Sequence, residues 1–139
     1  MGLIDFDATT LAATAEALGE RARAFPCDVS DHKSITDAVT EVASGGRVVG
    51  LVNAAGNHHS GPSLDMTPDE WHHVLGCHLD GSFYAAQAAA RLMVAAGTGG
   101  AIVNFASVAM DFGWPGRLPY SVAKAAIGAL TRTLAVEWA

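Results

Sequence analysis

The sequence predicts an α/β fold, in which short apolar segments alternate with segments that begin at helix-capping residues. The segment 48–52, Val-Val-Gly-Leu-Val, is a continuous apolar run, as expected for a parallel strand that is covered on both faces. The segment 101–105 is similarly rich in strand formers. Between them, Thr67-Pro68-Asp69-Glu70 has the pattern of a capping box with proline at the first helical position. This alternation is typical of a parallel sheet with helices packed on it.

Composition indicates one ordinary globular domain over residues 1–139, of which half are hydrophobic. No apolar run reaches the ~20 residues that cross a bilayer, and no leader peptide opens the chain, so we expect a cytoplasmic protein with no membrane partner. The net charge of -6 argues against binding to nucleic acid. Cys27 and Cys77 form neither a disulfide framework nor a metal motif, and are expected as reduced thiols in or near the core.

The first part of the chain reads as two units of a strand followed by a helix. A short apolar strand ends in Asp5, and Asp7 is a good N-cap for a helix over 8–20. A second strand is expected over 22–27. Ser30 is then expected to cap the next helix, whose apolar residues recur at helical spacing.

The second part contains two longer helices. The first is expected to run from Thr67 to Met93 and the second from Tyr120 to Trp138. The loop before the second helix is rich in glycine, proline and aromatic residues. Its Phe112 and Trp114 are expected to form the apolar wall of a pocket, with ordinary core packing as the alternative.

A candidate catalytic group lies around this loop. Ser107 follows the predicted strand at 101–105 and stands thirteen residues before Tyr120, which stands four before Lys124. A four-residue step places Tyr120 and Lys124 on one face of a helix. A nearby positive charge favours the phenolate form of a tyrosine, which suits it to proton transfer. A serine at the carboxyl end of a strand lies where open α/β sheets bind ligands. The three groups are therefore expected to converge on one oxygen.

These residues and their spacing resemble the catalytic core of the short-chain dehydrogenase/reductases, oxidoreductases that move a hydride between a nicotinamide cofactor and an alcohol or carbonyl. The Tyr120-x-x-x-Lys124 pair alone is a weak signal, since a surface helix often carries such a pair. The resemblance implies a partial Rossmann-like, doubly wound parallel sheet that lacks the first strand, its glycine-rich turn and the C-terminal strands. The whole chain would then be one partial NAD(P)-binding domain.

The resemblance also assigns catalytic roles. Tyr120 would donate or accept the proton, Lys124 would promote its ionisation and contact the nicotinamide ribose, and Ser107 would fix the substrate oxygen. Family members carry an Asn on the 67–93 helix that helps to hold a proton-relaying water, and His78 stands at that position here. An imidazole can also hold a water and move a proton.

Cofactor binding follows from the same resemblance. Asp5 would accept hydrogen bonds from the adenosine ribose and repel a 2′-phosphate, which favours NAD over NADP. Asp28 and Val29 would bracket the adenine. The alternative for Asp5 is an acid that only ends a strand, and the alternative for Asp28 is an ordinary loop acid. For the small residues after Asn53 the alternative is tight packing. The implied cofactor-binding residues are Asp5, Asp28, Val29, Asn53, Ala54, Ala55, Gly56, Tyr120 and Lys124.

The histidine pairs 58–59 and 72–73 do not predict a metal site. Neighbouring residues on a helix point about 100° apart, so they do not face one ion, and no HExxH motif is present. His58 and His59 are instead expected to line the mouth of a substrate pocket.

Two functional hypotheses remain open at this stage. The first is an NAD-dependent alcohol dehydrogenase or ketoreductase with a small alcohol or carbonyl substrate, forming a homo-oligomer through the 67–93 and 120–138 helices. The second is an inactive fragment that acts as a binding or dimerising module, because the sequence has no TGxxxGxG turn to hold the pyrophosphate. In the strand order 3-2-1-4-5-6 the chain would supply only strands 2 to 5. A gap of about 10 Å is then expected, unless the strand at Ile4 pairs with the strand at Leu51.

Overall fold

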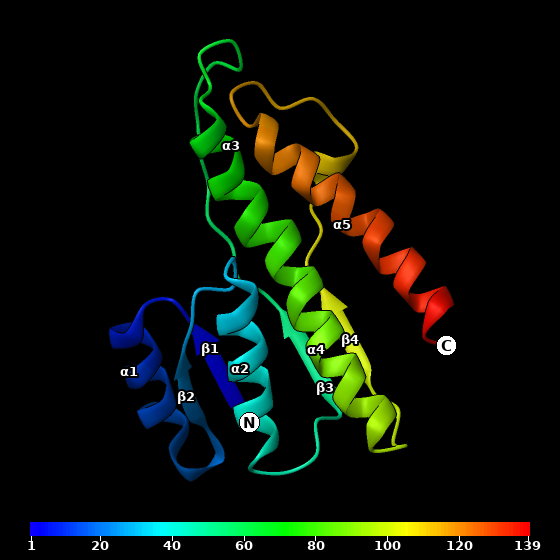
Figure 1. The fold of residues 1–139 in the computed structure, drawn as a ribbon. Coiled ribbons are helices and arrows are strands. Elements are labelled where there is room, and N and C mark those ends of the chain that lie inside the picture. The colour runs from blue at the N-terminus through cyan, green and yellow to red at the C-terminus, as the bar shows by residue number, and fades with distance from the viewer.

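The computed structural model describes all residues 1–139 and contains four short parallel strands (Figure 1). These are β1 (Gly2–Asp5), β2 (Arg23–Pro26), β3 (Gly50–Asn53) and β4 (Ala101–Asn104). In β1 and β2, Ile4 lies opposite Phe25, and in β3 and β4, Val52 lies opposite Val103. The predicted α/β class with parallel strands is therefore confirmed.

Helices connect the strands and extend beyond them. Figure 1 shows α1 beside β1 and β2, α4 running along β3 and β4, and α3 beside α5 at the far end. A π-helical turn, η2, joins α3 to α4 into one rod, so the predicted 67–93 helix is nearly continuous. No helix is both long and apolar enough to traverse a lipid bilayer. The helical elements are α1 (Ala8–Leu18), η1 (Gly19–Arg21), α2 (His32–Ala43), α3 (Pro68–Leu75), η2 (Gly76–Asp80), α4 (Gly81–Ala95), η3 (Val108–Met110) and α5 (Leu118–Glu137).

Capping residues start the helices where the sequence predicts them, with one exception. Asp7 accepts the Thr9 amide of α1 at 2.9 Å, and Thr67 forms the full capping box of α3. The prediction of Ser30 as the cap of α2 is wrong, because Asp31 fills that position. Ser30 donates its amide and its hydroxyl to Asp28 in a tight turn, so it is not available to the helix.

The four strands form two separate pairs. β1 pairs only with β2, and β3 pairs only with β4, so the strand at Ile4 does not move in beside the strand at Leu51. A cavity of about 620 Å³ lies between β1 and β3, and we name it the central cavity. The gap expected from the strand order is therefore present, and it leaves one edge of each pair without a partner strand.

The sheet is covered unevenly. Leu51 and Ile102 pack on the main core, which α4 helps to form, but Val52 and Val103 on the opposite face are 62% and 50% exposed. The prediction that segment 48–52 is covered on both faces is thus wrong, because no helix packs on that second face of β3. The core comprises Phe25, Cys27, Ile35, Ala38, Val39, Ala85, Ala88, Ala89 and Met93.

The accessible surface is large for the mass. It is 8344 Å², whereas a compact protein of 14.3 kDa exposes about 6,800 Å². Both cysteines are free, with Cys27 buried and Cys77 half-buried, in agreement with the predicted thiols. The open strand edges and the exposed sheet face contribute to this surface, and such edges recruit other strands.

We predict that this chain self-associates through its open edges. Val52→Lys should reduce the association without loss of fold, because the side chain is solvent-exposed and an edge lysine opposes strand pairing. Val136→Lys makes the same change at an 82% exposed position on α5 and should leave the association unaltered. Analytical ultracentrifugation over a concentration series measures the self-association of each variant. A wild-type chain that stays monomeric throughout would contradict the prediction.

Candidate active site

The carboxyl ends of the strands meet at one edge of the sheet, and a side-chain bridge holds β3 and β4 together there. The Asn53 amide donates to the Asn104 side chain at 2.9 Å and to the Ser82 carbonyl at 3.1 Å. Asn104 in turn donates to Thr131 of α5 at 3.0 Å. The bridge thus links β3 to β4 and also reaches α4 and α5.

Lys124 is the buried charge of this region. Its side chain is only 6% exposed, and the ammonium donates to the Phe105 carbonyl just after β4. It lies 5.7 Å from the centre of the Tyr120 ring, as the four-residue spacing predicts. Burial lowers the pKa of the Lys124 ammonium, while Tyr120 and Cys77 act in the opposite direction.

His78 packs against the same tyrosine. Its ring meets the Tyr120 ring edge to face, with centres 5.4 Å apart. The imidazole is 4% exposed, and its Nε2 lies 2.7 Å from the Asn57 carbonyl oxygen. Nδ1 is buried and has no partner within the protein. A β-carbon at Gly56 would come within 2.6 Å of this ring, so a glycine is needed there.

The π-helical turn η2 carries His78 into the site. The Gly81 amide bonds to the Gly76 carbonyl, one residue further back than in an α-helix. Single π turns inside helices are frequent at functional sites. Burial, with a smaller effect of the Lys124 charge, lowers the pKa of His78, whereas the Asn57 hydrogen bond raises it. The imidazole is therefore neutral at physiological pH.

Ser107 makes a local contact after β4. Its hydroxyl oxygen accepts the Ala109 amide at 3.1 Å and caps η3, which packs against α5. The hydroxyl hydrogen has no acceptor in the chain and is free to donate. The structure thus joins Tyr120, Lys124 and His78 directly, whereas Ser107 is held at the start of η3. The convergence of Ser107 with Tyr120 and Lys124 on one oxygen stays a prediction.

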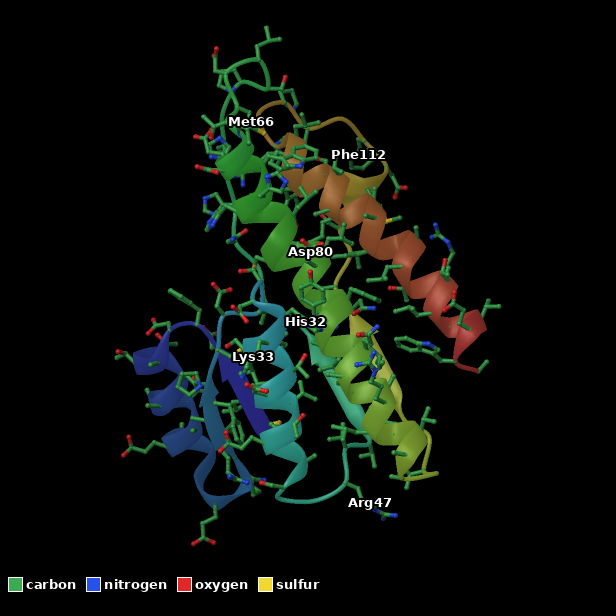
Figure 2. The ribbon with its side chains drawn as sticks, viewed as in Figure 1. His32, Lys33, Arg47, Met66, Asp80 and Phe112 are labelled. Atoms are coloured by element: carbon green, nitrogen blue, oxygen red, sulfur yellow. The ribbon has the colours of Figure 1, made fainter.

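A pocket of about 400 Å³ opens at Tyr120, and we name it the tyrosine pocket. The Gly61 amide donates to the Gly116 carbonyl at 3.1 Å and holds its two loops together. Two predictions for its wall are wrong. Phe112 is 63% exposed in the loop before α5 (Figure 2), and His59 lies 3.7 Å from Glu70 instead. The pocket is lined by Gly56, Asn57, His58, Trp114, Arg117 and Tyr120.

Comparisons with known proteins agree on one family. A family model described as Enoyl-(Acyl carrier protein) reductase matches residues 2–139. The D-threitol dehydrogenase of Mycolicibacterium smegmatis is 36% identical over 97% of this chain and 53% of its own length. The chain belongs to the short-chain dehydrogenase/reductase family.

Solved structures support the same assignment. The chain superposes on a gluconate 5-dehydrogenase from Burkholderia cenocepacia J2315, in complex with NADP and tartrate, with a TM-score of 0.90, at 32% identity and over 99% of this chain and 55% of the other. For an NAD⁺-bound xylitol dehydrogenase the TM-score is 0.91, at 31% identity, over 99% and 54% of the two chains. This short-chain dehydrogenase/reductase chain thus spans about half the length of these relatives.

Most of the residues predicted to bind cofactor border the central cavity, and Gly56 borders the tyrosine pocket. The Asp5 carboxylate is exposed and accepts the Asp7 amide through Oδ1, which leaves Oδ2 without a protein partner. A free carboxylate oxygen at a strand end fits a ribose diol. Asp28 stands apart, in its turn with Ser30. The residues at the cavity are Asp5, Val29, Asn53, Ala54 and Ala55.

Sequence reasoning missed two residues of the tyrosine pocket. Asn57 supports His78 with its backbone, and its side chain donates to the His73 carbonyl at 2.9 Å. Its position directly after Gly56 was the only available signal. Arg117 stands three residues before Tyr120, one helical turn away, and this spacing could have revealed it. No three His, Cys, Asp or Glu residues group in a way that could hold a metal ion.

We predict that His78 makes stability depend on pH. Below its usual pKa of about 6.5 the unfolded chain takes up a proton, but buried His78 resists protonation. The unfolded state is then favoured, so stability falls as the pH drops below about 6.5. His78→Gln should lessen that fall, whereas His72→Gln, at an exposed position, should not. Thermal melts across this pH range test the effect, and equal falls in both variants would contradict it.

Proposed function

We propose that this chain carries the reaction site of an NAD-dependent dehydrogenase or ketoreductase for a small alcohol or carbonyl. One observation carries the proposal: Tyr120 lines the tyrosine pocket and has the buried Lys124 ammonium 5.7 Å from its ring. A proton-transferring phenol beside a fixed cation, at the wall of a small pocket, suits alcohol chemistry. Family membership supports the same reaction class.

Tyr120 acts as the acid and base in this proposal. During reduction its hydroxyl donates a proton to the carbonyl oxygen, and during oxidation the phenolate accepts the alcohol proton. The Lys124 cation stabilises the negative charge on the phenol oxygen. Ser107, whose hydroxyl hydrogen is free, donates to the substrate oxygen and fixes its position.

The cofactor is held between the central cavity and the tyrosine pocket in this proposal. Bound nicotinamide supplies or accepts the hydride. Asp5 holds the adenosine ribose, Asn53 to Gly56 offer small residues for close approach, and Lys124 and Tyr120 reach the nicotinamide ribose. The solved relatives bind NADP in one case and NAD⁺ in another. For this chain, Asp5 favours NAD, because a carboxylate repels a 2′-phosphate.

His78 completes the proton path. Its neutral ring presents an unpartnered Nδ1, which can accept a hydrogen bond from a water molecule. A water there would connect the pocket to solvent and restore the proton on Tyr120. The two free cysteines are compatible with a reducing compartment such as the cytoplasm.

We predict that Tyr120→Phe abolishes turnover. A suitable protein is a chimera in which this chain replaces the matching part of the M. smegmatis D-threitol dehydrogenase, of which it covers 53%. Loss of the acid and base should slow alcohol oxidation by about 10²-fold or more, measured from the absorbance of NADH. Tyr84→Phe is the matched control, because Tyr84 packs against His32, away from the pocket.

A Tyr120→Phe chimera that keeps more than a few per cent of the rate would show that another group transfers the proton, with His78 as the first candidate. An inactive chimera that still binds NAD would favour the alternative of a binding module. Isothermal titration of the unmodified chain with NAD measures cofactor binding separately from turnover.

We predict a preference for NAD that depends on Asp5. Titration of the chimera with each dinucleotide should show tighter binding of NAD, and Asp5→Ser should weaken NAD binding and reduce the preference. Glu16→Gln removes a negative charge from the exposed face of α1 and should leave the preference intact. Tighter binding of NADP by the unmodified protein would overturn the assignment of Asp5.

A further inference from the structure

The tyrosine pocket contains a permanent positive charge that the reaction itself does not require. Arg117 directly precedes α5 and stands one helical turn before Tyr120, so the two side chains project from neighbouring positions. Both line the pocket. Arg117 makes no side-chain cap to α5, so its guanidinium has no role in starting the helix.

The guanidinium is held in place while its donors stay free. It lies 5.8 Å from the centre of the Trp114 ring, an arrangement in which an arginine stacks on an aromatic face. The residue is half-buried, and its side chain forms no salt bridge or hydrogen bond within the chain. A positioned guanidinium with free N–H groups binds a carboxylate through two parallel hydrogen bonds.

The charges around the pocket favour an anion. The chain carries 14 acidic and 8 basic residues, yet none of the acids lines this pocket. Its ionisable groups are Arg117, His58 and Tyr120, and the Lys124 ammonium lies 5.7 Å from the centre of the Tyr120 ring. The pocket is therefore locally positive in a chain of negative net charge, and this local charge attracts a small anion.

We infer that Arg117 binds a carboxylate group of the substrate, so that the pocket takes a small hydroxy acid or oxo acid. This inference rests on the proposed function for the role of Tyr120, which would act on the hydroxyl or carbonyl carbon. Arg117 and Tyr120 line the same small pocket, so a short carbon chain between them would place its carboxylate at Arg117 and its hydroxyl or carbonyl at Tyr120. A phosphate dianion is a poorer fit, because the pocket has only one permanently charged cation.

Two ligands of matched shape test the inference directly. Tartrate and threitol share a four-carbon diol skeleton, and they differ only in having carboxylates or hydroxymethyl groups at the ends. NMR titration of the full chain at constant ionic strength should show tartrate binding about tenfold or more tightly than threitol, with shifts at Arg117 and Tyr120. Inorganic phosphate is the third ligand and should bind more weakly than tartrate.

Substitutions distinguish specific binding by the Arg117 guanidinium from a general effect of positive charge. Arg117→Gln should remove the preference for tartrate, and Arg117→Lys should restore only part of it, because lysine lacks the planar fork. Arg132→Gln removes the same charge from an exposed position on α5 outside the pocket, and should retain the preference. Backbone NMR spectra of each variant show whether the fold is kept.

Three results would overturn the inference: no binding of tartrate by the unmodified chain, an undiminished preference in a folded Arg117→Gln variant, or tighter binding of phosphate. These readouts need no turnover. A chain that binds tartrate through Arg117 but fails to oxidise any alcohol would therefore contradict the proposed function alone.

Discussion

The hydrogen bond from Lys124 to the Phe105 carbonyl determines the geometry of the site. A buried ammonium is costly unless it is paired, and this carbonyl is its only hydrogen-bond partner in the chain. The bond fixes the register of α5 against the end of β4. Tyr120, one turn earlier, is thereby placed over the His78 ring, and Arg117, one turn earlier again, reaches the mouth of the pocket.

The two halves of the molecule differ in how closely their elements pack. In the half that holds the tyrosine pocket, α5 packs against α3 and η2, and Val74, Ala123 and Ile127 of these helices are almost completely buried. At the sheet, two strand pairs flank an open central cavity. The segment 53–56 connects these regions, since its first residues border the cavity and Gly56 borders the pocket. A dinucleotide held along that segment would link the open half to the closed half.

Features determined within a few residues could be predicted from the sequence. The capping box at Thr67 and the pairing of Tyr120 with Lys124 depend only on helical spacing, and the structure contains both. The prediction of a cap at Ser30 was wrong because Asp28 binds the Ser30 hydroxyl while Asp31 accepts the Ser34 amide, and the sequence pattern does not rank neighbouring capping residues.

Features that depend on distant contacts could not be predicted. The π turn adds one residue and shifts the helical phase, so regular helical spacing did not reveal the burial of the His78 ring. Arg117 and Asn57 line one pocket because two loops, far apart in sequence, are joined by the hydrogen bond between Gly61 and Gly116. The roles of the cofactor residues came from family resemblance and remain predictions.

The central claim is that the dinucleotide and the substrate meet at Tyr120. A crystal structure of the chimera with NAD and tartrate tests it most directly. We predict that the nicotinamide ribose contacts Lys124 and Tyr120, that the adenosine ribose contacts Asp5, and that tartrate occupies the tyrosine pocket. A dinucleotide bound away from segment 53–56, or a Tyr120 hydroxyl that contacts neither ligand, would contradict the account.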